Sequence, residues 1–370
     1  MSELKQLALV VGARPNFMKI APLMRAITDS GRGRSTLIHT GQHYDPSLSD
    51  VFFEQLEIPR PDVCLDVGSG SQAAQTARIM ERIEPVLEAG PKSGGKFDWL
   101  VVVGDVNSTM AAAIVAAKLG IPIAHVEAGL RSFDRTMPEE INRMVTDSIS
   151  DLLLVSDPAG MDQLAKEGHP AERIRLVGNL MIDTLMHSLD KARALDFLSH
   201  QGLTPGGYGV VTLHRPSNVD DPATLKAILA VLGEVSRELP LVFPVHPRTA
   251  ARIQEFGLDS VLDGFPGVRR MPPQGYLEFL ALTSSAKVVV TDSGGLQEET
   301  TVLSIPCLTM RENTERPITV SEGSSTLVGN DAGKLAEMLR RVIAGTYGVG
   351  HCPTLWDGKA ADRIVAALTA

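Results

Sequence analysis

Four carboxylates in the first half of the sequence lie where they could act as general acids or bases. They are Asp105 in VVVGDVNST, Glu127 in HVEAGLRS, and the pair Glu139 and Glu140 in MPEEINR. Asp105 and Glu127 each follow an apolar run, so neighbouring strands would bring both carboxylates to one substrate. Arg131 and Arg143 are available to keep them ionised. The alternative is a buried charge network that ties loops together.

A second set of residues is suited to phosphate. In GARPNFMK, Arg14 and Lys19 lie where the first apolar run ends and a helical stretch begins. Backbone amides at the start of a helix attract anions, so this segment could hold a phosphate or a leaving group. The alternative is an ordinary strand-to-helix turn with solvated cations.

The stretch TDSGGLQEET, after the apolar run KVVVTD, suggests a second phosphate site. Ser293, Gly294 and Gly295 open a predicted helix there, and the glycines permit close backbone approach to a diphosphate. Glu298 and Glu299 lie one turn further on, where one of them could hydrogen-bond a ribose diol. The alternative is an N-capped helix with a solvated glutamate in its first turn.

Three further loops of the second half place cations or hydroxyls directly beyond predicted strands. They are TLHRPSNV with His214 and Arg215, PVHPRT with His246, and RENTERP with Arg316. A lone histidine is usually a structural one. Three such loops beside the SGG turn could form an anion pocket, which favours ligand contact by at least one of His214 and His246.

The elements that must position these residues are short apolar runs, such as LALVVG, WLVVVGD and LLLVS, which alternate with helical stretches. Runs buried on both faces are typical of parallel sheets. A second series begins after a helix-like stretch (181–199) and the turn-rich GLTPGGYG. We therefore predict an α/β chain of two Rossmann-like, doubly wound domains facing across a cleft. The first domain covers residues 1–185, a linker 186–207, and the second domain 208–357.

Several function classes are disfavoured. VGARPNFMK lacks the GxGxxG of dinucleotide sites, and GPKSGGKF departs from a P-loop because Phe97 replaces the Ser or Thr and a strand follows. The formal net charge of −9 argues against nucleic-acid and anionic-membrane partners. The cysteines, Cys64, Cys307 and Cys352, form no CxxC pair, so neither a disulfide framework nor a metal site is expected. No apolar run approaches the roughly 20 residues that span a bilayer, so a cytoplasmic location is expected.

Taken together in order and spacing, the motifs resemble those of one known family. GARPNFMK, GDVNST, HVEAGLRS, MPEEINR, LHRPSN, PVHPR, TDSGGLQEE and RENTERP are similar to the serial motifs of the non-hydrolysing UDP-N-acetylglucosamine 2-epimerases. The resemblance covers nearly the whole chain. It implies a GT-B fold, a C-terminal helix (358–370) that packs back on the first domain, a homodimer, a UDP-sugar substrate, no cofactor, and a role in making cell-surface polysaccharide.

The resemblance also implies roles for single residues. Asp105, Glu127 and Glu139 resemble the catalytic carboxylates of the family, and His214 its important histidine near the diphosphate. Arg14 and Lys19 match leaving-group and phosphate contacts. The UDP-binding positions are matched by Ser293, Gly294, Gly295, Glu299 and Arg316, and Arg143, Arg215 and His246 complete the residues predicted to bind the UDP-sugar. The spacing does not assign acid and base among the carboxylates.

The reaction implied is reversible epimerisation at C2 of UDP-GlcNAc to UDP-ManNAc, through elimination of UDP to a 2-acetamidoglucal and its re-addition. Four alternatives stay open: a hydrolysing epimerase that releases ManNAc and UDP, an epimerase for diacetamido sugar nucleotides, a GT-B glycosyltransferase, and a nucleotide-sugar sensor.

One departure from the family bears on regulation. Many bacterial relatives need a second UDP-GlcNAc beside the active site and carry a Gln-His-Arg-Gln-like stretch and a later Arg-Gln. Here the corresponding residues are Gln42-His43-Tyr44-Asp45 and Ser71-Gln72. An amide has become a carboxylate and an arginine a serine, which predicts weak or absent activation by UDP-GlcNAc.

Overall fold

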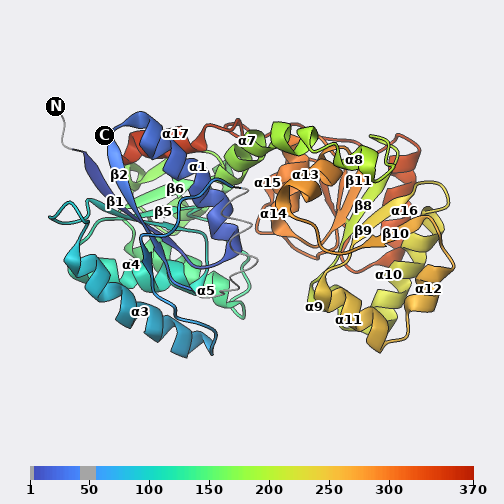
Figure 1. Ribbon diagram of the computed structural model, residues 1–370, viewed down its shortest axis with the longest axis horizontal. Helices are drawn as coiled ribbons and strands as arrows, with labels where there is room; N and C mark the ends of the chain where they lie inside the picture. Colours follow the sequence, from blue (N-terminus) through green and yellow to red (C-terminus); the bar gives the residue numbers. More distant parts are fainter. Residues whose placement is uncertain (1–3, 42–55) are drawn as a thin grey trace. The chain divides into compact units, whose positions relative to one another are not determined.

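The computed structural model describes residues 4–41 and 56–370. The chain divides into two units, Met1–Met186 together with Thr354–Ala370, and His187–Pro353 (Figure 1). The boundary lies inside one helix, α7 (Leu180–Ala194).

Within the described residues, the first unit is built on a parallel sheet in the order β3-β2-β1-β4-β5-β6-β7. Its strands are β1 Lys5–Val11, β2 Gly33–His39, β3 Val63–Cys64, β4 Trp99–Val103, β5 Ile123–Val126, β6 Leu152–Val155 and β7 Ile174–Leu176. The central strands are apolar and buried on both faces, because helices cover both sides of the sheet. The strand order reverses between β1 and β4, so the carboxyl ends of these two strands border a crevice in which doubly wound sheets bind ligands.

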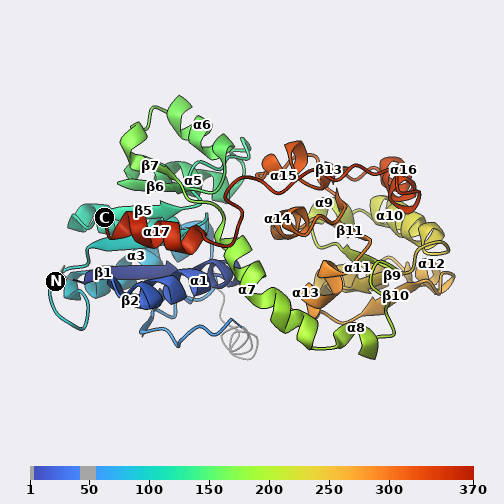
Figure 2. The same ribbon diagram turned by 90° about the horizontal axis from the view of Figure 1, so that it is seen from above.

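Helices pack on both faces of this sheet. They are α1 Arg14–Ser30, α3 Gln72–Ala89, α4 Asn107–Leu119, α5 Pro138–Ile149, α6 Pro158–Lys166, the 3-10 turn Ala171–Arg173, the first half of α7, and α17 Ala360–Leu368. Helices α3, α4 and α5 cover one face, and α1 and α17 lie together on the other (Figures 1 and 2). The C-terminal helix α17 thus packs against α1, and the Trp356 indole nitrogen donates a 3.0 Å hydrogen bond to the Ser156 carbonyl.

The second unit repeats the plan with the parallel order β10-β9-β8-β11-β12-β13. Its strands are β8 Gly209–Thr212, β9 Leu241–Pro244, β10 Val268–Met271, β11 Val288–Thr291, β12 Cys307–Thr309 and β13 Ser325–Leu327. Here the order reverses between β8 and β11. Its helices are α8 Phe197–His200, α9 Pro216–Val219, α10 Pro222–Val235, α11 Pro247–Glu255, α12 Asp259–Asp263, α13 Tyr276–Ser284, α14 Gly294–Val302, α15 Ile318–Ser321 and α16 Ala332–Ile343. Apolar side chains of α10, α11, α12 and α16 form the core on one face, and those of α8, α13 and α14 contribute to the core on the other.

The predicted class, two Rossmann-like doubly wound domains, is confirmed. The predicted helical stretch 181–199 is in fact two helices, because the chain leaves the helical conformation at Asp196, whose φ is +51°. No helix within residues 4–41 and 56–370 has the length and apolar character needed to cross a membrane.

Candidate active site

Several of the predicted site residues follow the strands that border the switch points of the two sheets. In the first unit, the segment with Lys19 follows β1 and Asp105 follows β4. In the second unit, His214 follows β8, and Ser293 follows β11. Each sheet therefore presents its polar loops at the edge where ligands of doubly wound folds bind.

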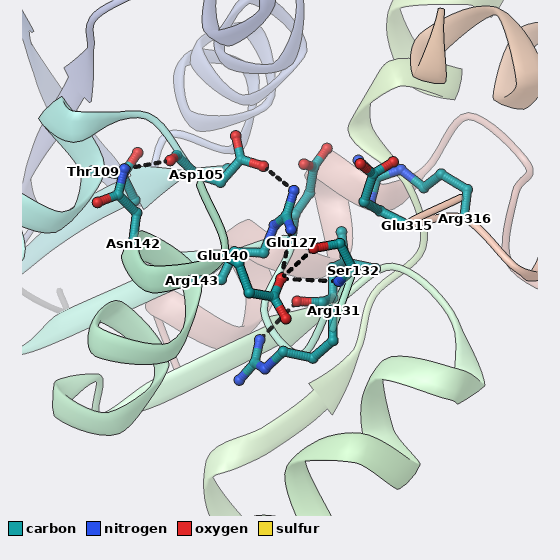
Figure 3. A network of polar contacts seen from close by, with 12 residues as sticks. Asp105, Thr109, Glu127, Arg131, Ser132, Glu140, Asn142, Arg143, Glu315 and Arg316 are labelled. Carbon is teal, nitrogen blue, oxygen red and sulfur yellow. Dashed lines mark hydrogen bonds and ion pairs between the residues drawn. The ribbon is translucent and has the colours of Figure 1, made fainter. Parts of the chain in front are cut away.

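Asp105 is held by an arginine from α5. Arg143 is buried, and its guanidinium donates to Asp105 Oδ2 at 2.5 Å and to Glu140 Oε2 at 2.8 Å (Figure 3). The Asn142 amide donates to the Asp105 carbonyl oxygen at 2.8 Å. The Asp105 side chain remains about one-third exposed, at 32%. Asp105 is thus an oriented, charge-paired carboxylate that a ligand can reach.

The adjacent glutamates of α5 differ in their surroundings. Glu140 is buried and accepts hydrogen bonds from Arg143 and from the backbone N–H groups of Ser132 and Phe133. Burial acts to raise the pKa of Glu140, but these hydrogen bonds outweigh it and lower the pKa. Glu139 is half-buried, and its side chain forms no hydrogen bond or ion pair with any residue that the structure describes. Glu140 therefore anchors a loop, whereas Glu139 is available for chemistry.

Glu127 pairs with Lys19 from the first turns of α1. The distance from Lys19 Nζ to Glu127 Oε2 is 2.6 Å, and the two side chains are 11% and 3% exposed. The backbone of Glu127 is left-handed, with φ +68°. The residue before Asp105, Gly104, has a φ of +72°, in the left-handed region that favours glycine. The lysine predicted to contact phosphate is therefore also the ion-pair partner of a predicted catalytic carboxylate.

Arg131 does not pair with the carboxylates that the sequence predicted as its partners. Its guanidinium forms ion pairs with Asp147, at 2.7 Å, and with Glu167, at 2.6 Å, instead of with Asp105 or Glu127. The sequence could not reveal this, because both partners lie on helices whose packing on the sheet is a tertiary property.

The turn between β1 and α1 is organised by Asn16. Its Oδ1 accepts hydrogen bonds from the Gly12 and Ala13 amides, and its Nδ2 donates to the Val103 carbonyl at 2.9 Å. The Gly12 and Ala13 amides, which precede the start of α1, thus already have a hydrogen-bond partner within the protein. A Cβ on Gly12 would lie 2.1 Å from Ser108 Oγ, so close packing on α4 requires this glycine. Arg14 begins α1, and its side chain is outside the described part of the structure.

In the second unit, His214 forms a dyad with an aspartate that the sequence analysis did not single out. His214 Nδ1 lies 2.6 Å from Asp292 Oδ1, and Asp292 also accepts hydrogen bonds from the backbone N–H groups of His214 and Arg215. Burial acts to raise the pKa of Asp292, but the hydrogen bond and charge of His214 outweigh it and lower the pKa. An ionised Asp292 requires Nδ1 to donate, which reserves Nε2 for a ligand.

His246 and Arg215 complete this edge. The rings of His214 and His246 lie 5.4 Å apart, and burial together with the charge of His214 lowers the pKa of His246. Arg215 Nε donates to the Asp292 carbonyl at 3.0 Å. His246 Nδ1 accepts from the Arg248 amide at 3.2 Å, so this nitrogen carries no proton there.

The SGG turn opens α14 as predicted. Ser293 is the N-cap residue and α14 begins at Gly294. A Cβ on Gly294 would meet no protein atom closer than 3.9 Å, so protein packing does not require this glycine.

The two glutamates of α14 are both buried. Arg316 Nε pairs with Glu298 at 2.6 Å. Glu299 has its pKa raised to about 8, first by burial and then by the charge of Glu298. Glu299 is therefore a protonated carboxyl at neutral pH, able to donate a hydrogen bond.

Comparison with known proteins decides the family. A family model described as UDP-N-acetylglucosamine 2-epimerase matches residues 25–369. A protein named UDP-N-acetylglucosamine 2-epimerase from Methanococcus maripaludis is 39% identical over 345 residues, which cover 91% of this chain and 92% of the relative. The chain belongs to the UDP-N-acetylglucosamine 2-epimerase family.

Solved structures agree with this assignment. The Methanocaldococcus jannaschii UDP-GlcNAc 2-epimerase, solved in complex with UDP-GlcNAc and UDP, superposes with a TM-score of 0.85 and is 38% identical, with 98% of this chain and 99% of that chain covered. The predicted GT-B fold is thereby confirmed. A Pseudomonas aeruginosa relative, UDP-2,3-diacetamido-2,3-dideoxy-D-glucuronate 2-epimerase, is also 39% identical, over 341 residues that cover 91% of this chain and 92% of the relative.

The residues tied to the regulatory expectation are only partly described. Gln42, His43, Tyr44 and Asp45 lie outside the described residues. Ser71 is the N-cap of α3, and Gln72 Oε1 accepts a 2.6 Å hydrogen bond from Asn107. In the part of the chain that the structure describes, no group of three or more His, Cys, Asp or Glu side chains is arranged to hold a metal ion.

Proposed function

We propose that this epimerase interconverts UDP-GlcNAc and UDP-ManNAc and retains UDP until it is re-added, so that free sugar is not released. The observation that carries the proposal is the pair of cation-held carboxylates. Asp105 with Arg143 and Glu127 with Lys19 follow β4 and β5, which pair in parallel with Val103 opposite Val126.

The chemistry explains why a set of carboxylates is needed. The C2 hydrogen of UDP-GlcNAc is not adjacent to a carbonyl, so direct proton removal would leave an unstabilised carbanion. In an elimination, a carboxylate takes the C2 proton, the electron pair forms the C1–C2 double bond, and UDP leaves with the C1–O electrons. A proton then returns to the opposite face of C2, and UDP adds back to C1. Asp105, Glu127 and Glu139 are the proposed acids and bases.

Departure of UDP develops negative charge on the diphosphate. We propose that His214, Arg215, the amides of Ser293 and Gly294, and Arg316 stabilise this charge in the second unit. Fixed cations and amides aimed at a developing charge lower such barriers effectively. The open space beside Gly294 supports the approach of a diphosphate to the backbone. Glu299, protonated at neutral pH, is proposed to hydrogen-bond the ribose.

A second candidate substrate is a UDP-2,3-diacetamido uronic acid. It is favoured by the Pseudomonas aeruginosa relative, which matches this chain at the same 39% identity as the Methanococcus maripaludis epimerase. The C2 chemistry would be the same, and only the groups around C3 and C6 would differ. We further infer that the protein acts as a homodimer, as the family resemblance implies.

The test is to incubate pure protein with UDP-GlcNAc alone in D2O and to follow the products by NMR. We expect UDP-ManNAc to appear without free ManNAc. Free ManNAc and UDP as the main products would support a hydrolysing enzyme instead. Faster turnover of the diacetamido uronic acid nucleotide at equal concentration would favour the second candidate.

A further inference from the structure

The imidazole of His125, directly behind the two catalytic strand ends, has both ring nitrogens engaged. The ring is fully buried. Nε2 lies 2.9 Å from the Gly104 carbonyl oxygen, and Nδ1 lies 2.7 Å from Asp147 Oδ1. A carbonyl oxygen can only accept a hydrogen bond, so Nε2 must carry a proton.

The second ring nitrogen, Nδ1, faces Asp147, and other groups hold this carboxylate in place. Asp147 Oδ2 accepts from the Gly129 amide at 3.1 Å and pairs with Arg131 at 2.7 Å. Burial acts to raise the pKa of Asp147, but the charge and hydrogen bond of His125, followed by those of Arg131, outweigh it and lower the pKa. Each ring nitrogen of His125 therefore faces a fixed acceptor, the Gly104 carbonyl oxygen at Nε2 and the Asp147 carboxylate at Nδ1. Glu167 pairs with the same arginine as Asp147, so the cluster joins His125, Asp147, Arg131 and Glu167.

This cluster reaches the two strand ends that carry the carboxylates. Gly104 directly precedes Asp105, and its amide donates to the Val126 carbonyl at 3.0 Å. His125 lies on β5, two residues before Glu127, which directly follows that strand. Gly104 and Glu127 are both left-handed, with φ of +72° and +68°. This conformation is unfavourable for a non-glycine residue such as Glu127, so surrounding contacts must hold it.

We propose that the buried His125–Asp147 pair is a positioning device that fixes Asp105 relative to Glu127, so that protons leave and return on opposite faces of C2. The device rests on the proposed epimerase function. His125 and Asp147 act through the strand ends and have no contact with the sugar themselves.

Two substitutions of His125 separate positioning from mere stability. In His125→Asn, the amide nitrogen takes the place of Nδ1, which keeps the Asp147 contact and loses the Gly104 contact. In His125→Gln, the amide nitrogen takes the place of Nε2, which keeps the Gly104 contact. We expect kcat to fall about 10- to 100-fold in His125→Asn, with KM little changed, and several-fold less in His125→Gln.

The second readout is the fate of deuterium in D2O. Two initial rates are measured: the rate at which the starting nucleotide gains deuterium at C2, and the rate at which the other epimer forms. Their ratio is determined once with UDP-GlcNAc and once with UDP-ManNAc as the starting nucleotide. In His125→Asn this ratio should rise several-fold in at least one direction, because a displaced carboxylate delivers its proton poorly to the opposite face. Ile83→Val, which shortens a fully buried core side chain of the first unit, is the control for general destabilisation and should leave the ratio unchanged.

The third readout is made on the wild-type protein and does not depend on whether the variants fold. Nitrogen-15 NMR of labelled histidine should show a His125 Nε2 proton that is hydrogen-bonded to the Gly104 carbonyl. A His125 Nε2 without this hydrogen bond, a greater loss of activity in His125→Gln than in His125→Asn, or an unchanged ratio in both variants would overturn the positioning proposal alone. A wild-type enzyme that epimerises neither candidate nucleotide would overturn the proposed function, and the positioning role of His125 with it.

Discussion

The substitution Arg143→Met tests whether Asp105 depends on its arginine. Arg143 is only 5% exposed and joins Asp105 Oδ2 and Glu140 Oε2, at 2.5 and 2.8 Å. Methionine retains much of the length and the apolar packing of the side chain but has no charge and no donor. The change therefore removes both ion pairs and leaves α5 otherwise intact.

The two ion pairs contribute unequally. The bond to Glu140 is buried and charge-assisted, and such bonds contribute about 1.5–3 kcal/mol. The bond to Asp105 is screened because that side chain is 32% exposed, so its contribution to stability is about 0–1 kcal/mol. We expect the free energy of unfolding to fall by about 1.5–4 kcal/mol. A catalytic carboxylate that is displaced by about 1 Å can cost roughly 100-fold in rate, so kcat should fall about that much.

A double-mutant cycle with Asp105→Asn gives the assay. We measure kcat, KM and urea unfolding for the wild type, both single variants and the double variant. If Arg143 acts through Asp105, Arg143→Met should lower kcat little further once Asp105 is asparagine. The same fold loss in both backgrounds, or a rise in KM with kcat unchanged, would refute this reasoning and indicate that Arg143 contacts the substrate directly.

Four further predictions concern the rest of the chain. We expect kcat to fall by about 10²–10⁴-fold in each of three variants, Asp105→Asn, Glu127→Gln and Glu139→Gln. Their affinity for UDP, measured by calorimetry, should change little. Near-normal kcat in all three would assign these carboxylates structural roles. Asp183 accepts hydrogen bonds from the Ala360 and Ala361 amides, and its pKa is raised to about 6 from 3.8, first by burial. Because the folded form binds the proton more tightly, the stabilisation from Asp183 is fully present below about pH 4. About 3 kcal/mol of this stabilisation is lost as the pH rises to 6. The Tm of the wild type should therefore fall over this pH range, whereas the Tm of Asp183→Asn should not show this loss. Turnover in D2O should place deuterium at C2 of both epimers without added NAD or metal, and protium retained at C2 would contradict elimination. Pure UDP-ManNAc should be converted without a lag and without added UDP-GlcNAc, and a strict need for that nucleotide would show that activation persists.

Much of the fold could be predicted because parallel strands leave a direct pattern. Strands such as β4 and β11 are buried on both faces, so each is a continuous apolar run that ends in a polar turn. The helix that opens at Gly294 was predicted from its place directly after the apolar run KVVVTD. The interruption at Asp196 was not, because a residue other than glycine in the left-handed region carries little sequence signal.

The partners of the site residues were harder to predict. Only the family resemblance separated Glu139 from Glu140, because the residue types in MPEEINR do not show that one is half-buried and the other is enclosed by Arg143 and two backbone amides. Asp292 is part of a recognised motif, yet its role as the partner of His214 depends on β8 and β11 being neighbours. Arg131 has partners on α5 and α6 in place of the expected carboxylates.

The sequence by itself determined the class of the fold, the family, and the set of polar residues at the strand ends, because these depend on local apolar patterning and on motifs within short segments. Only the tertiary structure decided which charges meet. Lys19 and Glu127 are 108 residues apart, and His125 and Asp147 are 22 apart on different elements. Such pairs form because strand order brings β1, β4 and β5 side by side and because the packing of α5 excludes water from the charges it covers. In that setting a charge must be paired, and the available partner is set by the neighbouring element rather than by the neighbouring residue.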